Sequence, residues 1–238
     1  MTNILDIGSR NVNGTLRDVK PPAAAYLGVD LTPGPGVELV LQDPHRLPFD
    51  DDSFDVVVST SCLEHDPLFW LTFGEMLRVV RPGGFVYINA PSNGVYHGYP
   101  FDHWRFYPDA GRALEAWSRR LSRPAILIES FIGRKVGDVW ADNVMVFSLE
   151  PLPSVLPEPL LHARVPGSSN VRVHGCADLL AVDLFPEDLR ELRAATDALS
   201  QLRAQLQQRD EQLAELTEAL QTLRKRCAES TPSASEGA

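Results

Sequence analysis

The chain has 238 residues, of which 44% are apolar, enough for one core of ordinary domain size and an additional segment. Its formal charge of −10 argues against nucleic acid as a partner, because binding to that backbone depends on lysine and arginine. No apolar run is long enough to span a membrane, and no basic, cleavable leader begins the chain. The three cysteines, Cys62, Cys176 and Cys227, suggest neither disulfides nor a zinc site. We therefore expect a cytoplasmic protein without a bound metal.

Short apolar runs alternate with turns and helical patterns through the first 150 residues. Helical spacing over residues 69–80 stops before Pro82, and Pro108 suits the first turn of a helix that reaches about residue 120. The apolar runs predict seven strands, at residues 4–7, 26–30, 37–41, 54–59, 85–90, 125–131 and 143–149. This order predicts an α/β fold over residues 1–150, a doubly wound, mostly parallel seven-stranded sheet with helices on both faces.

The first strand leads into a turn between two glycines. Residues 3–14 read NILDIGSRNVNG, so the strand carries Asp6, breaks at Gly8 and is followed by a polar turn to Gly14. A buried strand, a glycine turn and a helix start are how open α/β sheets build a ligand cradle. The free N–H groups of a helix start suit a carboxylate or a phosphate. The turn is neither GxGxxG nor a P-loop, so it does not identify the ligand by itself.

Carboxylates stand at the ends of three successive predicted strands, at Asp6, Asp30 and Asp43. An acid after the second strand, about 20 residues beyond the glycine turn, suits two ribose hydroxyls. An acid after the third strand can accept a hydrogen bond from an exocyclic amine. Each acid alone also fits a solvated strand end, whereas the set in this order outlines an adenosine.

Four segments carry a family resemblance: LDIGSRNVNG, YLGVDL, LVLQDPHRLPFDDDSFDVVVSTSCLEH and EMLRVVRPGGFVYINAP. Together they resemble the class I S-adenosylmethionine-dependent methyltransferases, and within these the small-molecule branch that includes ubiquinone-biosynthesis-type enzymes. The resemblance covers residues 3–150. Two departures stand out: Arg10 and Asn11 replace a usually small, glycine-rich turn, and the usual helix before the first strand is missing, as is most of the crossover before Val37.

The resemblance implies S-adenosylmethionine as cofactor and a role for each matching residue. The turn would hold the methionine end, which Thr60 and Ser61 would line. Asp30 would hold the ribose and Asp43 the adenine amine, while residues 44–47 flank the ring. Arg10 would pair with the cofactor carboxylate. The implied cofactor-binding residues are Asp6, Gly8, Ser9, Arg10, Asn13, Gly14, Asp30, Leu31, Asp43, Pro44, His45, Leu47, Thr60 and Ser61.

Methyl transfer to a hydroxyl or an amine also needs a base with a pKa near the working pH. His65, at the implied substrate mouth beside Glu64, is one candidate. The aromatic loop, defined as residues 95–107, holds the others: His97, and Asp102 with His103 as an oriented base. The alternative is that these histidines only make structural hydrogen bonds. The density of aromatic side chains favours a cyclic acceptor, such as a sugar.

The second half of the chain changes in character. We expect residues 151–187 to be a proline-rich linker and an irregular segment, in which residues 171–173 could form a strand. Leucines repeat every seven residues over 188–228, which predicts a coiled-coil helix with one polar core residue, Arg209. A single amphipathic helix docked on the body is the alternative. The tail, 229–238, has the composition of a disordered segment.

Three functional hypotheses follow. The first is an S-adenosylmethionine-dependent methyltransferase that acts on a small-molecule or glycan-linked acceptor at oxygen and associates with itself or a partner through residues 188–228. The second is a non-catalytic, degenerate methyltransferase domain that serves as a coiled-coil scaffold or binding module. A nicotinamide-dependent dehydrogenase fits poorly, because no GxGxxG is present.

Overall fold

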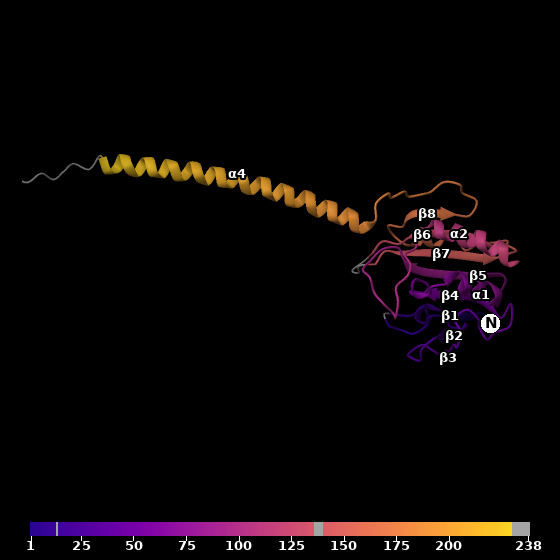
Figure 1. Ribbon diagram of the computed structural model, residues 1–238. Helices are drawn as coiled ribbons and strands as arrows, with labels where there is room; N and C mark the ends of the chain where they lie inside the picture. The colour runs from indigo at the N-terminus through magenta and orange to yellow at the C-terminus, as the bar shows by residue number, and fades with distance from the viewer. Residues whose placement is uncertain (13, 136–139, 230–238) are drawn as a thin grey trace, which may run out of the picture. The chain divides into compact units, whose positions relative to one another are not determined.

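The computed structural model describes residues 1–12, 14–135 and 140–229. The chain divides into two compact units, Met1–Glu187 and Asp188–Ala238. The first unit is built around a β-sheet, and the described residues of the second all belong to the helix α4 (Glu187–Glu229) (Figure 1). No helix among the described residues combines the length and the apolar character needed to span a membrane.

Eight strands form one sheet, in the order β3-β2-β1-β4-β5-β7-β6-β8. The five strands from β3 to β5 are parallel, and β7, β6 and β8 each pair antiparallel with their neighbours. The strands are β1 (Asn3–Ile7), β2 (Ala25–Asp30), β3 (Leu39–Val40), β4 (Phe54–Thr60), β5 (Val80–Pro91), β6 (Ala125–Ile132), β7 (Asp142–Leu149) and β8 (Ser169–Val173). The carboxyl ends of β1, β2, β4 and β5 therefore lie along one edge of the sheet, where ligands bind in open α/β folds.

The main core lies between one face of the sheet and two helices, α1 (Phe69–Val79) and α2 (Asp109–Ser118). Phe73, Met76 and Leu77 of α1 are fully buried, because they repeat on one side of the helix and meet the apolar residues of β4, β5 and β7. The opposite face carries only short helices among the described residues. These are η1 (Leu16–Val19) and α3 (Leu161–Arg164).

Proline and glycine explain why the connections on that opposite face are short. Pro21 follows η1 closely and cannot continue a helix. The chain then passes from β2 to β3 through residues 32–37, which contain two prolines and two glycines and form no helix. This segment packs against the glycine turn, where the Asn11 N–H donates to the Pro35 carbonyl at 2.8 Å.

The prediction of seven strands is wrong by one. All seven predicted strands form, although β3 has only two residues, and the sheet gains β8 at its edge beside β6. Val171 of β8 is buried against Phe131 and Val144, so burial on the sheet outweighs the shortness of this run. The compact unit accordingly extends to Glu187, beyond the predicted domain end at residue 150.

The remaining helical segments are η2 (Leu63–His65), which follows β4, and η3 (Arg119–Leu121), which continues α2. The helix α4 is continuous over 43 residues, in agreement with the helix predicted at 188–228. Its heptad leucines are all 48–63% exposed. The predicted tail, apart from residue 229, lies outside the described residues.

Candidate functional site

The turn after β1 is packed so tightly that its first residue must be glycine. Gly8 has a φ of +76°, and a Cβ at this position would lie 2.5 Å from the Sγ of Cys62. Cys62 follows β4, so the glycine lets the ends of β1 and β4 approach closely. Burial raises the pKa of the Cys62 thiol, which keeps this side chain neutral. The close contact brings the turn next to Glu64 and His65 in η2.

Asp30 lies at the end of β2 and faces the same turn. Its carboxylate accepts from the backbone N–H of Arg10 at 3.3 Å and from the N–H and the hydroxyl of Thr32 at 2.9 and 3.2 Å. The side chain is only partly buried, and a carboxylate has about four acceptor sites, so one site is open and a second becomes available when the Thr32 hydroxyl turns away. Asp43 is exposed after β3 and caps its own turn by accepting from the His45 N–H at 2.8 Å.

Three buried acceptor atoms on β1, on the glycine turn and on β5 have no hydrogen-bond partner among the described residues. They are Oδ1 of Asp6, Oγ of Ser9 and Oδ1 of Asn89. The other oxygen of Asp6 accepts from the Tyr26 hydroxyl at 2.7 Å, and burial raises the pKa of Asp6 to about 6. Unpaired buried acceptors are costly, so this group fits a ligand that donates hydrogen bonds, such as one with an ammonium group.

Arg10 links the glycine turn to the aromatic loop. Its guanidinium donates to the Tyr99 hydroxyl at 2.6 Å and to Thr32 at 3.4 Å, with its charge 5.8 Å from the centre of the Tyr99 ring. The Gly14 N–H donates to the Asn11 side chain at 2.9 Å. The predicted site residue Asn13 lies outside the described residues.

The other predicted cofactor residues are spread along the same edge. His45 contacts Asp66 through Nε2 at 3.0 Å. Leu47 is buried in the core, so its side chain supports the segment rather than facing solvent. Leu31 is 52% exposed, Pro44 and Thr60 are half-buried, and Ser61 is exposed with a φ of +47°.

The aromatic loop is anchored on η2. The N–H groups of His103 and Trp104 donate to the Glu64 carbonyl at 2.8 and 3.2 Å, and the indole N–H of Trp104 donates to the Asp66 carbonyl. The Tyr99 contact with Arg10 holds the loop at a second point. The loop therefore crosses from η2 to the glycine turn.

The expected pairing of Asp102 with His103 does not form. The Asp102 carboxylate instead accepts two hydrogen bonds from Arg105, at 2.5 and 2.7 Å, and one from the His97 N–H at 2.9 Å. The Arg105 guanidinium holds the pKa of Asp102 well below its usual range. His103 is exposed, and its ring packs near Phe101. Arg105 is thus engaged with Asp102 in this structure.

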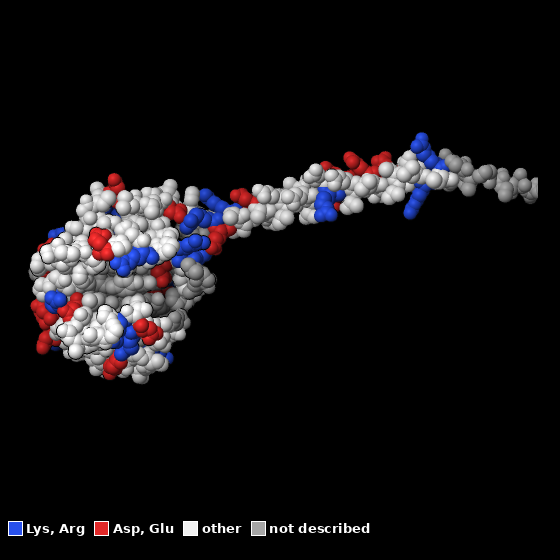
Figure 2. Space-filling model, turned by 180° about the vertical axis from the view of Figure 1, so that it is seen from behind, with Lys and Arg blue, Asp and Glu red and all other residues white. Residues whose placement is uncertain are grey.

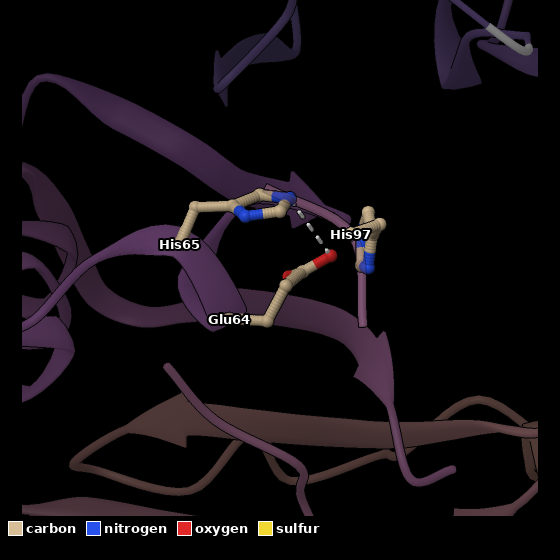
Figure 3. Close-up of side chains that lie close together, drawn as sticks. All are labelled: Glu64, His65 and His97. Atoms are coloured by element: carbon tan, nitrogen blue, oxygen red, sulfur yellow. Dashed lines mark ion pairs between the residues drawn. The ribbon is translucent and has the colours of Figure 1, made fainter. Parts of the chain in front are cut away.

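Glu64 and two histidines form a cluster beside this anchor, defined here as the Glu64–His65–His97 cluster (Figure 3). One ligand atom from each residue lies within 4.8 Å of the others. Burial raises the pKa of Glu64 to about 7 and lowers the pKa of His65 below its usual value. Sequence reasoning singled out His65 and His97 separately as base candidates. It missed their proximity, because 32 positions in the chain separate them and only the loop conformation joins them.

A family model described as "Methyltransferase domain" matches residues 5–88, which run from β1 to β5. This match agrees with the family resemblance that the sequence predicts for these residues. The model covers well under half of the chain.

Two curated mycobacterial proteins are similar over overlapping parts of the chain. A phthiotriol/phenolphthiotriol dimycocerosates methyltransferase of Mycobacterium leprae is 41% identical over 88 residues, covering 30% of this chain and 32% of the relative. An uncharacterized methyltransferase of Mycobacterium marinum is 34% identical over 117 residues, 42% of this chain and 44% of the relative. The chain thus matches less than half the length of either relative.

Among solved structures, a Burkholderia thailandensis 1,6-didemethyltoxoflavin-N1-methyltransferase aligns with 62% of this chain and 70% of its own. It is 15% identical, with a TM-score of 0.44, and was solved with 1,6-didemethyltoxoflavin and S-adenosylhomocysteine bound.

Proposed function

We propose that this protein is an S-adenosylmethionine-dependent methyltransferase. The carrying observation is that Asp30 ends β2 directly beside the glycine turn, within a segment that matches methyltransferase domains. Asp43 and the unpaired acceptors of Asp6 and Ser9 lie near ends of adjacent strands, as an extended nucleoside ligand with a charged amino-acid end requires.

Each end of that ligand has a suitable group on this chain. Asp30 accepts from the two ribose hydroxyls, Asp43 from the adenine amine, and Asp6 with Ser9 from the ammonium group. Arg10 exchanges its contact with Tyr99 for the ligand carboxylate. S-adenosylmethionine supplies a methyl group on a positively charged sulfur, which leaves by in-line displacement. The chain itself has to orient the acceptor and remove its proton.

The acceptor in this proposal is a small or glycan-linked molecule that is methylated at oxygen. Two features support this choice. The aromatic loop presents Tyr96, Tyr99 and Phe101 at 51–76% exposure, which are faces on which a ring can stack. His65 has a lowered pKa, so a neutral imidazole is available near neutral pH to take a hydroxyl proton. His65 is therefore a better base candidate here than the exposed His103.

Calorimetric titration with S-adenosylmethionine tests the cofactor site. We expect binding to the unmodified chain and at least tenfold weaker binding to Asp30→Ala, because two charge-assisted hydrogen bonds to the ribose are lost. The matched control is Asp18→Ala, which removes an exposed acid from η1. Unchanged affinity in Asp30→Ala would refute the ribose assignment.

Absence of any heat, and of any shift in melting temperature with S-adenosylmethionine or S-adenosylhomocysteine, would instead favour the scaffold hypothesis. A protein with a functional site gains roughly 2.7 kcal/mol in free energy of unfolding when the ligand concentration is a hundred times its dissociation constant, so its melting temperature should rise.

We also propose that α4 pairs with a second copy of the chain as an antiparallel coiled coil. Its core leucines are exposed in the single chain, and Figure 2 shows long uncharged stretches along the helix between separate charged groups. In a parallel pair the two Arg209 side chains would meet in the core, which is unfavourable. An antiparallel pair places each Arg209 opposite a Leu206 instead.

The charges flanking the core support the antiparallel register. With Leu192 opposite Leu223, Arg203 of one copy lies beside Asp210 of the other, and Glu191 beside Arg226. The parallel register forms no opposite-charge pair of this kind between the equivalent flanking positions. The antiparallel register therefore combines leucine packing with charge complementarity.

Cys227 provides a direct test, because it continues the leucine series. In a parallel pair two Cys227 side chains face each other, whereas the antiparallel register places Cys227 opposite Asp188. We expect oxidation to cross-link Asp188→Cys into dimers and to leave the unmodified chain uncross-linked through this residue. Dimers linked through Cys227 in the unmodified chain would overturn the register. A molar mass of a single chain, measured by light scattering, would overturn the proposal that α4 pairs with a second copy.

A further inference from the structure

The Glu64–His65–His97 cluster brings an acid and two imidazoles together from two separate segments. Glu64 and His65 are adjacent in η2, whereas His97 comes from the aromatic loop after β5. In Figure 3 the Glu64 carboxylate points toward the space between the two rings, whose centres are 4.8 Å apart. The three side chains therefore converge on one point.

Glu64 is buried but incompletely paired. Its residue exposure is 1%, and Oε2 has no hydrogen-bond partner among the described residues. Oε1 lies 3.7 Å from Nε2 of His65, which is too long for a hydrogen bond. A buried carboxylate in this condition needs a cation or a proton beside it.

A hydrogen bond at Nδ1 of His65, on the side of the ring away from Glu64, fixes the tautomer of this histidine. Nδ1 lies 2.6 Å from the Phe101 carbonyl oxygen, which can only accept, so Nδ1 must carry a proton. In the neutral ring Nε2 then has a lone pair, and this is the nitrogen on the Glu64 side. A backbone carbonyl behind one nitrogen is a typical support for a histidine that binds a metal through the other.

His97 lies beside a carboxylate, although its Nδ1 makes no hydrogen bond among the described residues. Its Nδ1 lies 3.3 Å from Oδ2 of Asp102, whose side chain is 2% exposed and is held by Arg105. The ring also packs against Trp140 at 4.6 Å between centres. The carboxylate and the indole together restrict the orientation of the imidazole.

We propose that the Glu64–His65–His97 cluster binds one divalent transition-metal ion of the Zn²⁺ type. Two imidazoles and one carboxylate form the ligand set of many catalytic zinc sites and of two-histidine, one-carboxylate iron sites. Imidazole disfavours Mg²⁺ and Ca²⁺, which prefer oxygen ligands. Three protein ligands leave coordination positions open for an acceptor oxygen. Because a bound ion would occupy the Nε2 lone pair of His65, the ion would then replace His65 as the group that assists loss of the acceptor's proton. That last role rests on the proposed methyltransferase activity, whereas ion binding does not.

The test is a titration of the full-length, chelator-treated protein with CoCl₂, followed by visible absorption, and with ZnCl₂, followed by calorimetry. We expect one ion per chain, a Co²⁺ spectrum that Zn²⁺ abolishes, and no comparable binding of MgCl₂. Glu64→Gln keeps the size of the side chain and removes its charge, and His97→Gln removes the ligand from the loop. Each substitution should weaken Zn²⁺ binding about tenfold to a hundredfold or more, because even residues that only hold a metal ligand in place have effects of that size.

His103→Gln is the matched control, because it removes an exposed histidine from the same loop and should leave Zn²⁺ affinity unchanged. Circular dichroism of every variant shows whether it folds, and the two ligand variants provide independent readings if one fails. Absence of Co²⁺ and Zn²⁺ binding would overturn the proposal, as would equal Zn²⁺ affinity in folded Glu64→Gln and His97→Gln. All titrations are made without S-adenosylmethionine, so their result is independent of cofactor binding.

Discussion

Two buried glutamates, Glu129 and Glu64, each lie beside a histidine, but they differ in how completely their carboxylates are hydrogen-bonded. Glu129 on β6 is 2% exposed and accepts from the backbone N–H groups of Leu161 and His162, and it also contacts Nδ1 of His162 at 2.7 Å. Glu64 is equally buried but has an oxygen without a hydrogen-bond partner among the described residues. Full pairing indicates a structural role, whereas incomplete pairing at a ligand-binding edge indicates a role in binding.

Glu129→Ala should have the largest effect, on stability. The change leaves two N–H groups of α3 and the imidazole of His162 without their acceptor, which costs about 3–5 kcal/mol by analogy with a broken buried pair. Urea unfolding followed by circular dichroism measures the loss. Glu64→Gln is the comparison and should cost much less. A loss below about 1 kcal/mol in Glu129→Ala would remove the contrast between the two glutamates.

The second effect is a pH dependence that comes from Glu64. Burial raises its pKa from 4.5 to about 7, so the folded state holds this proton more tightly than the unfolded state. The contribution of Glu64 to the free energy of unfolding is therefore fully present below pH 4.5 and is lost as the pH rises through about 7. The shift corresponds to a loss of up to roughly 3 kcal/mol between pH 4.5 and 8.

Urea unfolding at pH 5 and pH 8 in the presence of a chelator measures this loss. Glu64→Gln should remove most of it. Asp6, whose pKa is raised to about 6, contributes in the same direction and remains in that variant, so the difference between the two proteins isolates Glu64. An identical pH dependence in both proteins would mean that Glu64 is already paired.

Arg105→Lys should have the smallest effect, about 1 kcal/mol. Lysine keeps the positive charge but cannot reproduce the two parallel hydrogen bonds to Asp102. Because Asp102 also accepts from the His97 N–H, we expect faster hydrogen exchange at that amide. Unchanged exchange would show that the loop holds His97 without Arg105. Glu129 and its partners lie outside this loop and should be unaffected.

The sheet was predictable because its strands are continuous apolar runs bounded by turn residues. Asp30 and Asp43 follow such runs, so their places at the ends of β2 and β3 could be inferred from the sequence alone. β8 was less predictable, because a proline-rich stretch separates its short apolar run from the rest of the sheet. Its burial depends on contacts with Phe131 and Val144, which are distant in the sequence.

The candidate site was less predictable, because it depends on the conformation of one loop. Adjacency suggested an Asp102–His103 pair, but the side chain of Asp102 instead meets Arg105 and His97, three and five positions away. The proximity of Glu64 to His97 depends on how that loop lies against η2, and no local sequence pattern predicts it. The available signals were a histidine flanked by aromatic residues and the adjacent Glu64 and His65, and no sequence pattern joined them.

The hydrogen bond between Arg10 and Tyr99 has a thermodynamic consequence for the order of events at this edge. A ligand whose carboxylate takes Arg10 from Tyr99 changes the free energy with which the aromatic loop is held. Linkage requires the reverse effect to be equal, so an acceptor that orders Tyr99 elsewhere changes the affinity of the turn for its ligand by the same factor. One side-chain contact thereby makes the two binding events interdependent, although the chain separates their residues by 89 positions.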